Sequence, residues 1–137
     1  MILVVDDEHN LADTMVAILE LAGYRGIAAY SAEEAMAILH REKPALIISD
    51  VVMPGANGVQ LAIEARRLWP ELQILLLSGN VATQQIMDTA RRDGHAFELL
   101  AKPLPPEQLV LKVASLINGK SRMVNKKSKK TAAEKAS

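Results

Sequence analysis

Acidic, hydroxyl and ammonium side chains stand directly after four apolar stretches of this sequence. They are Asp6, Asp7, Asp50, Ser78 and Lys102. Carboxylates that are brought together repel one another, and a bound divalent cation removes that conflict. Oxygen ligands in a chain without cysteine suit Mg²⁺, which often shares its site with a phosphate. If these side chains meet, one carboxylate could attack phosphorus and form an aspartyl-phosphate, while the lysine and the hydroxyl neutralise the phosphoryl oxygens.

Each of these residues also has a simpler interpretation. A lone Asp after a strand is commonly a turn former or a helix N-cap, so Asp6 and Asp7 are ambiguous when taken alone. Lys102 could be a surface lysine before a proline, and Ser78 could be a simple cap. The functional interpretation therefore depends on whether the elements that carry these residues bring them to one place.

The apolar stretches are predicted to be strands that alternate with helices. The expected strands are residues 2–5, 26–30, 45–49, 73–78 and 97–101. Apolar residues at helical spacing predict helices over residues 11–23, from Ser31 to before Pro44, after Gly58 to before Pro70, over 83–92, and from Pro105 to near Gly119. This alternation predicts an α/β fold with a parallel sheet and helices on both faces. Ligands of such sheets bind at the carboxyl ends of the strands, where the reactive side chains stand.

The composition excludes several classes of protein. There is no cysteine, and therefore neither a disulfide framework nor a thiolate site. The apolar start at Met1–Val5 runs at once into acidic residues, unlike a signal peptide, and no stretch has the length of a membrane span. We therefore expect a soluble cytoplasmic domain.

The charges are unevenly distributed along the chain. Residues 1–118 carry 9 Lys and Arg against 15 Asp and Glu, a net charge of −6, whereas residues 119–137 carry 7 against 1, a net charge of +6. Helical periodicity ends near residue 121, which favours a solvated, disordered basic tail over 119–137. The alternative is a weak electrostatic contact with nucleic acid, an anionic membrane or an acidic partner.

Taken together and in this order, four motifs identify a family resemblance. The motifs are Val4-Val5-Asp6-Asp7-Glu8, Asp50-Val51-Val52-Met53-Pro54-Gly55 with Gly58, Leu77-Ser78-Gly79, and Lys102-Pro103. Over about residues 1–118 the chain resembles the response-regulator receiver domain of two-component signalling. The resemblance implies a flavodoxin-like (βα)5 fold, a doubly wound five-stranded parallel sheet of order 2-1-3-4-5.

The resemblance also implies how the acidic residues act. Asp50 would be the phospho-acceptor. Asp7, Asp50 and the backbone carbonyl of Val52 would bind Mg²⁺ directly, and Asp6 would hold the metal through water. Lys102 would pair with the phosphoryl group.

Further roles follow at the ends of the last two strands. Ser78 would be the switch hydroxyl, Gly79 would leave room beside the phosphoryl site, and the Lys102-Pro103 bond would be cis. The family usually has an aromatic residue three positions before the lysine, where this chain has Leu99. Phe97 is therefore either a displaced substitute or, as we expect, an ordinary core residue.

The loop after Asp50 contains two residues with expected structural roles and one departure from the family. Pro54 and Gly58 are expected to shape the loop. Val52 is apolar where polar residues are common. We hypothesise that its side chain changes the access of attacking water and therefore the lifetime of the phosphate.

The function implied is a stand-alone receiver, a signalling phospho-acceptor and not an independent enzyme. It would take a phosphoryl group from a sensor histidine kinase or phosphotransfer protein, dephosphorylate itself slowly, and signal by binding an unknown protein target. We expect no direct DNA binding, because a tail of about 19 residues holds no further domain; a phosphorylation-dependent homodimer is a further expectation. The alternatives are a phosphorylation-independent scaffold, a receiver excised from a larger regulator or hybrid kinase, and a metal-dependent phosphohydrolase.

Overall fold

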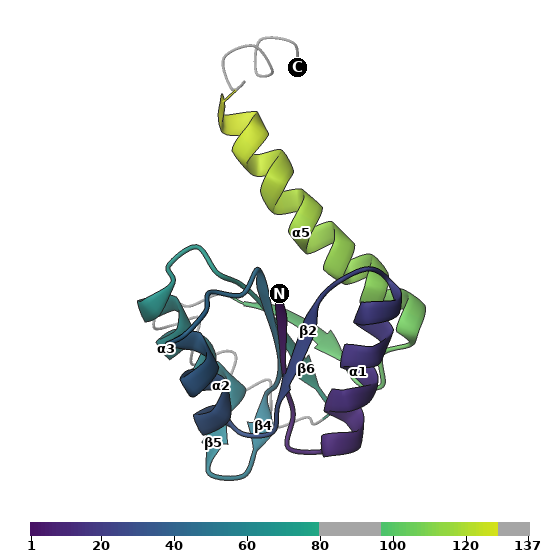
Figure 1. Cartoon of the computed structure of the whole chain (residues 1–137), viewed down its shortest axis with the longest axis vertical. Coiled ribbons are helices and arrows are strands. Elements are labelled where there is room, and N and C mark those ends of the chain that lie inside the picture. The colour runs from purple at the N-terminus through teal and green to yellow at the C-terminus, as the bar shows by residue number, and fades with distance from the viewer. Residues whose placement is uncertain (80–96, 129–137) are drawn as a thin grey trace.

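The structure is a computed structural model that describes residues 1–79 and 97–128. Strands and helices alternate along the chain, except that two short strands stand between β3 and α3 (Figure 1). The elements are β1 Ile2–Val5, α1 His9–Leu21, β2 Gly26–Ala29, α2 Ala32–Leu39, β3 Leu46–Asp50, β4 Val52–Met53, β5 Ala56–Asn57, α3 Gly58–Leu68, β6 Gln73–Ser78, β7 Glu98–Ala101 and α5 Pro106–Ser128. The helix predicted over 83–92 lies outside the described residues.

Five of the strands form one parallel sheet. Its order is β2-β1-β3-β6-β7, which confirms the predicted order 2-1-3-4-5 and the flavodoxin-like α/β fold. The register aligns Val5 with Ser49, Asp50 with Leu77, and Ser78 with Ala101. The carboxyl ends of the four strands β1, β3, β6 and β7 are therefore level with one another.

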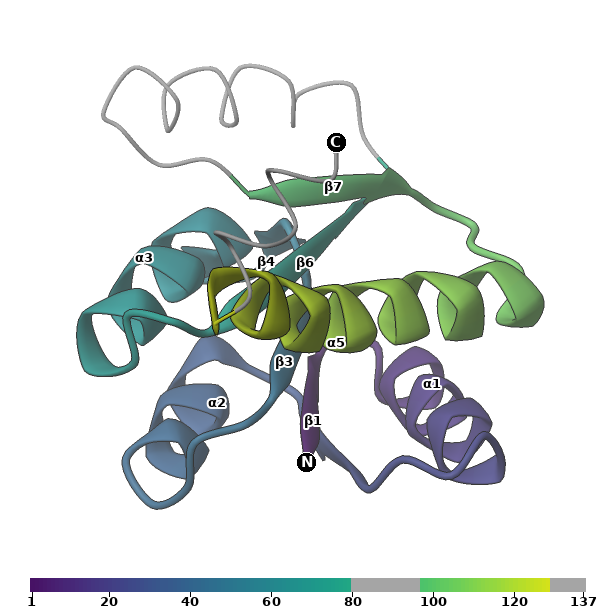
Figure 2. The same ribbon diagram turned by 90° about the horizontal axis from the view of Figure 1, so that it is seen from above.

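Helices cover both faces of the sheet, and the strands bury side chains on both. Along β1, Leu3 and Val5 pack in a core cluster with α2 and α3, whereas Ile2 and Val4 pack in a second cluster with α1 and α5. Figure 2 shows the two pairs of helices on opposite sides of the sheet. This alternation explains why the strands read as continuous apolar runs, as expected for a parallel sheet covered on both faces.

Side-chain caps begin two of the helices. The Ser31 hydroxyl accepts from the Glu34 backbone N–H at 3.1 Å, which is one half of a capping box. The Glu34 carboxylate accepts from the N–H of Tyr30, one residue before the N-cap. Asn57 caps α3 by accepting from the Gln60 N–H at 2.7 Å. The start of α3, close to Asp50, is therefore well defined.

The segment after β3 is a small hairpin, which sequence reasoning described only as a loop. Val52 pairs with Asn57 and Met53 pairs with Ala56, in antiparallel register. Pro54 and Gly55 form the turn between them, and Gly55 has a φ of +78°, as the third position of a type II turn requires. Two-residue strands are too short to give a periodic signal in the sequence.

The prediction that the last helix ends near Gly119 is wrong, because α5 continues to Ser128. A glycine inside a helix costs only about 1 kcal/mol relative to alanine, and the Lys and Arg residues that follow are good helix formers. Its C-terminal part extends beyond the other elements (Figure 1). Residues 119–128 of the predicted basic tail are therefore helical; the boundary at residue 118 stays a prediction, and residues 129–137 lie outside the described ranges.

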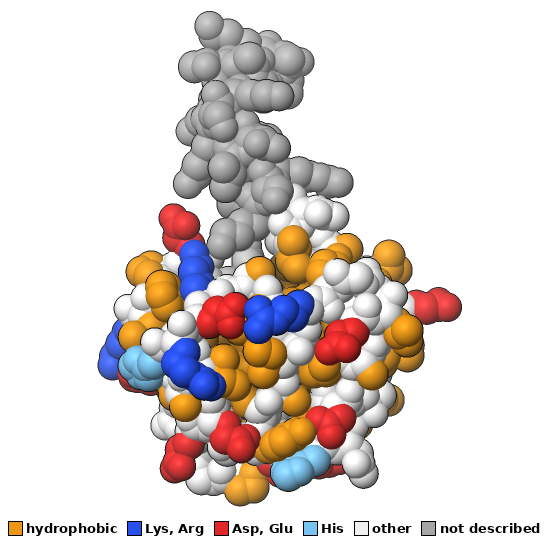
Figure 3. All heavy atoms as spheres, viewed as in Figure 1, with side chains coloured by type: hydrophobic (Ala, Val, Ile, Leu, Met, Phe, Trp, Pro, Cys, Tyr) orange, Lys and Arg blue, Asp and Glu red, His pale blue; other side chains and the backbone are white. Residues whose placement is uncertain are grey.

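The described surface mixes charges of both signs. Figure 3 shows acidic and basic side chains interspersed with apolar ones on one face. The acidic excess of residues 1–118 is therefore not gathered into one patch on that face. None of the helices in residues 1–79 and 97–128 combines the length and apolarity that a membrane span needs.

Candidate functional site

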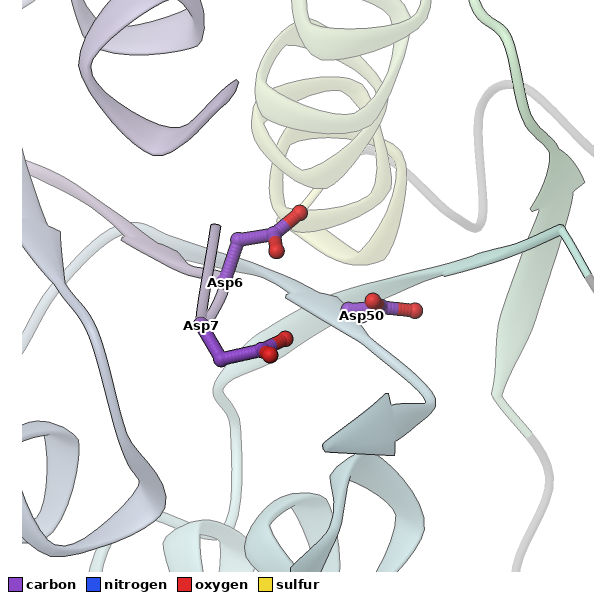
Figure 4. Close-up of side chains that lie close together, drawn as sticks. All are labelled: Asp6, Asp7 and Asp50. Carbon is purple, nitrogen blue, oxygen red and sulfur yellow. The ribbon is translucent and has the colours of Figure 1, made fainter. Parts of the chain in front are cut away.

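Three carboxylates meet beyond the ends of two adjacent central strands. Asp6 and Asp7 follow β1, and Asp50 is the last residue of β3. One oxygen from each carboxylate lies within 4.8 Å of the other two, as the close-up in Figure 4 illustrates. Asp6 is fully buried, and Asp7 and Asp50 are half-buried. The sheet thus brings together the three acids that the sequence predicted.

Lys102 supplies the positive charge at this site. Its Nζ donates to Oδ2 of Asp6 at 3.0 Å and to Oδ2 of Asp50 at 3.1 Å. Burial lowers the pKa of Lys102, but its hydrogen bonds and proximity to the two carboxylates outweigh burial, so the net pKa is raised and the ammonium stays charged at neutral pH. The predicted cis peptide bond between Lys102 and Pro103 is confirmed.

The donor set fits Mg²⁺. All three acids offer hard oxygen atoms, and a single cation can bridge oxygens at these separations directly or through its waters. Asp6 already accepts from Lys102 at Oδ2 and from the Glu8 N–H at Oδ1, 3.0 Å away. Within the described ranges, Asp7 accepts no protein hydrogen bond. Asp7 is therefore the acid most available to a metal, and Asp6 the one already satisfied by the protein.

The predicted residues at the carboxyl ends of β6 and β7 lie next to one another. Ser78 ends β6, and its backbone carbonyl accepts from the Lys102 N–H at 2.7 Å, which ties the ends of β6 and β7 together. A Cβ added to Gly79 would lie 3.7 Å from Cβ of Lys102, so this glycine faces the lysine stem. The switching role predicted for the Ser78 hydroxyl stays a prediction.

Gly58, the first residue of α3, lies against the backbone of Asp50. A Cβ added at Gly58 would lie 2.2 Å from the backbone oxygen of Asp50, a separation that no side chain tolerates. Its N–H donates to the Val51 carbonyl at 2.7 Å. The structural role expected for Gly58 thus has a physical reason, namely the close approach of α3 to the backbone of Asp50.

Phe97, which precedes β7, and Leu99, which lies on β7, pack in the hydrophobic core. Phe97 is 8% exposed, and the Arg66 guanidinium lies 4.8 Å from its ring centroid. Leu99 is half-buried and packs against the same cluster. The interpretation of Phe97 as a core residue is confirmed, and Leu99 occupies the position where the family usually has an aromatic residue.

Sequence reasoning missed one buried polar side chain at the site. Ser49 is 1% exposed, and its hydroxyl donates to the backbone oxygen of Asp50 at 2.9 Å. A serine inside an apolar run, directly before the acid, was the signal that could have revealed it. Val52, two residues beyond Asp50, has a side chain that is 45% exposed, which agrees with a place at the mouth of the site.

An open parallel sheet with three acids and a lysine at the carboxyl ends of its strands has the charges that a divalent cation and a phosphoryl group would need. The match to known families is more specific: residues 2–114 match the response regulator receiver domain. The chain therefore belongs to the response regulator receiver family.

Individual relatives agree with this assignment. The chain is 31% identical over 140 residues to the C4-dicarboxylate transport transcriptional regulatory protein DctD of Rhizobium meliloti. The alignment covers 99% of this chain and 29% of that protein. It is 35% identical over 113 residues to the response regulator protein FleR of Pseudomonas aeruginosa, with coverage of 82% and 24%. The chain thus spans about a quarter of these relatives' length.

Solved structures show the same fold. A CheY-like response regulator receiver domain protein from Methanospirillum hungatei superposes with a TM-score of 0.80 at 25% identity, over 89% of this chain and 96% of that one. The general function of this family is to accept a phosphoryl group in signal transduction. Receiver domains generally use Mg²⁺ at an acidic pocket, and they interact with kinases and effectors.

Proposed function

We propose that this chain accepts a phosphoryl group on Asp50 from a phosphohistidine of a sensor kinase or phosphotransfer protein, in a Mg²⁺-dependent reaction. The observation that carries the proposal is the convergence of Asp6, Asp7 and Asp50 within 4.8 Å, with Nζ of Lys102 3.1 Å from Oδ2 of Asp50. Asp50 is the nucleophile in this proposal because it ends the central strand β3, accepts a hydrogen bond from Lys102 and, unlike the fully buried Asp6, is partly exposed to an incoming donor.

In the proposed transfer, an oxygen of Asp50 forms a bond to phosphorus while the bond between phosphorus and the donor imidazole nitrogen breaks. The electron pair of that bond stays on the nitrogen, and the imidazole, which carries a proton on its other ring nitrogen, leaves as the neutral base. Lys102, now bridging Asp6 and Asp50, would keep its contact with Asp6 and donate to a phosphoryl oxygen. Ser78, at the end of β6, would supply the second donor as the switch hydroxyl.

The metal contributes charge neutralisation. Bound Mg²⁺ would offset the negative charge of the phosphoryl oxygens and of the acids together. Asp7, Asp50 and the Val52 carbonyl would hold it directly, and Asp6, whose oxygens already accept from Lys102 and Glu8, would hold it through water.

The phosphorylated state would then be lost slowly by attack of water on phosphorus, which restores the Asp50 carboxylate and releases inorganic phosphate. Until then, the aspartyl-phosphate would bias a two-state equilibrium of the last two strands and adjacent helices. Leu99 lies on one of these strands, so the conformational signal would pass without the usual aromatic switch.

Mass spectrometry after incubation with acetyl phosphate and Mg²⁺ tests the assignment. We expect a mass increase of about 80 Da, the mass of one phosphoryl group, which is absent in Asp50→Ala and in excess EDTA. Asp13→Asn, which removes an exposed acid of α1 outside the site, serves as the matched control and should be labelled like the wild type. An unlabelled wild type, under conditions that label another receiver, would contradict the proposal.

The same assay separates the rival functions. A phosphorylation-independent scaffold would show no adduct and would bind its partner equally well as Asp50→Ala. A phosphohydrolase would instead turn over phosphate esters continuously. Val52 stands two residues after Asp50, where such enzymes commonly have a second acid, and this disfavours the hydrolase.

The output of the chain is a proposal of a different kind. Since the two relatives named above are about three and a half times as long as this chain, and one is a transcriptional regulator, the chain could act alone by binding a protein target or as the receiver of a longer regulator. A cytoplasmic location and a phosphorylation-dependent homodimer through the last two βα units belong to the same proposal. Part of that face lies outside the described residues.

A further inference from the structure

Ser49 is the one buried polar side chain, among the described residues, that has no role in the proposed phosphotransfer. On β3 it shares a strand face with Ile47, which packs in the cluster under α2 and α3. A hydroxyl in such a place costs free energy unless it is hydrogen-bonded. Its 2.9 Å bond to the backbone oxygen of Asp50 satisfies it, and at the same time engages the residue that carries the acceptor carboxylate.

Gly58 packs against the same carbonyl group. Its missing Cβ would lie 2.2 Å from the Asp50 oxygen, 3.0 Å from the Asp50 carbonyl carbon and 3.0 Å from Oγ of Ser49. The Asp50 carbonyl is therefore confined between the Ser49 hydroxyl and the first residue of α3. Because Gly58 has no side chain, the Asp50 carbonyl and the Ser49 hydroxyl both fit against the start of α3, and the hydroxyl can donate to the carbonyl.

Hydrogen bonds fix the two consecutive peptide groups that follow Asp50. The peptide between Asp50 and Val51 accepts from Ser49 at its oxygen and donates its N–H to the Leu77 carbonyl at 3.0 Å. The next peptide accepts at the Val51 oxygen from the Gly58 N–H at 2.7 Å. Rotation of either peptide would move the Asp50 side chain and the Val52 carbonyl relative to each other.

We propose that Ser49 is a positioning residue: with Gly58 it fixes the backbone from Asp50 to Val52, and so sets the separation of the acceptor carboxylate from the Val52 carbonyl. This inference rests on the proposed function, in which both groups hold Mg²⁺. Ser49 touches neither phosphate nor metal and acts only through the backbone of Asp50. Preorganisation of this kind matters because ligand atoms about 0.5 Å out of place weaken a site.

The test compares Ser49→Ala and Ser49→Cys with the wild type and with Ser31→Ala. Cysteine has the same shape as serine and is slightly larger, but it is only a weak donor, so it fills the space while weakening the hydrogen bond. Ser31→Ala removes another single hydroxyl, the cap of α2, away from the site. For each protein, the Kd of Mg²⁺ is measured by titration calorimetry, the rate of Asp50 labelling by acetyl phosphate at saturating Mg²⁺, and the Tm.

We expect Ser49→Ala and Ser49→Cys each to raise the Mg²⁺ Kd by about fivefold and to slow labelling by a similar factor, as loss of one buried hydrogen bond implies. Ser31→Ala should lower the Tm, because α2 loses its cap, while leaving the Mg²⁺ Kd and the labelling rate at their wild-type values. The proposal is overturned if Ser49→Ala changes only the Tm, or if Ser49→Cys recovers wild-type affinity, because the side chain would then be mere packing.

Failure of the underlying function has a different signature. If wild-type protein forms no Asp50 adduct, the phosphotransfer assignment falls, whatever the serine variants do. If the wild type is labelled and the Mg²⁺ Kd of Ser49→Ala equals that of Ser31→Ala, only the positioning role falls.

Discussion

Replacing Asp7 by Asn should stabilise the metal-free protein and remove most of its response to Mg²⁺. Asp7 has an oxygen within 4.8 Å of oxygens of Asp6 and Asp50. Among the described residues, the one cation that pairs with these acids is the Lys102 ammonium, which bonds the other two. The site therefore carries a net charge of about −2, and Asp7→Asn reduces it by one unit. The substitution keeps the shape of the side chain.

The size of the effect follows from the geometry. Two unit charges 4.8 Å apart repel by about 3.5 kcal/mol at an effective dielectric constant of 20. Asp7 is half-buried, so solvent screening reduces each repulsion, and the lost attraction to Lys102 offsets part of the remainder. A net gain of about 1 kcal/mol is expected, which raises the Tm of a domain of this size by about 3–5 °C.

Mg²⁺ should reverse the order of stability. A cation that binds the native state stabilises it by about 2.7 kcal/mol at a concentration of 100 times its Kd. Wild type gains this amount, whereas Asp7→Asn, which lacks the acid most available to the metal, gains little at the same concentration. The two curves of Tm against Mg²⁺ concentration are therefore expected to cross.

Thermal melts by circular dichroism, in EDTA and at increasing MgCl₂, provide the assay. Glu20→Gln, which removes an exposed acid from α1, is the control and should shift the Tm equally with and without metal. A metal-free Asp7→Asn that melts at or below the wild-type temperature, together with parallel responses to Mg²⁺, would refute the electrostatic account of the site.

Two further predictions concern residues around the site. Val52→Asn should accelerate loss of the phosphoryl group, by up to about tenfold, because an amide at this exposed position can orient attacking water; equal dephosphorylation rates of the purified phosphoproteins would exclude the proposed effect of Val52 on lifetime. Trp69→Phe should lower the free energy of unfolding in urea by about 1–2 kcal/mol, because it removes the 3.0 Å bond from Nε1 to the Leu39 carbonyl that joins α3 to α2. Asp50 labelling by acetyl phosphate should stay unchanged in Trp69→Phe, and slower labelling would show that this contact reaches the site.

Much of the fold could be predicted because its signals are local. Short apolar runs marked the strands of the main sheet, as at β1 and β6, and Ser31 marked the start of α2. The end of α5 could not be predicted in this way, since a single glycine costs a helix little and tertiary context decides whether the helix continues. The hairpin of β4 and β5 could not be predicted either, because strands of two residues are too short to show an alternation of apolar and polar residues.

The candidate site, like the fold, could be predicted only in part from the sequence. The types and order of Asp6, Asp7, Asp50 and Lys102 already defined the chemistry, because each followed a predicted strand of a parallel sheet. Their distances did not follow from the sequence. The 3.0 and 3.1 Å bonds of Lys102 depend on the register of β7 against β6 and of β3 against β1, which is set by packing across the whole sheet.

The sequence alone was thus sufficient to predict the alternation of strands and helices and the reactive groups at the strand ends. These features depend on hydrophobic periodicity and turn residues, which act over short stretches. Contacts between distant segments required the folded molecule. The close approach of Gly58 to the Asp50 carbonyl, with the Ser49 hydroxyl beside it, is one such contact. It depends on how α3 packs beneath β3, and local sequence preferences carry no information on that separation.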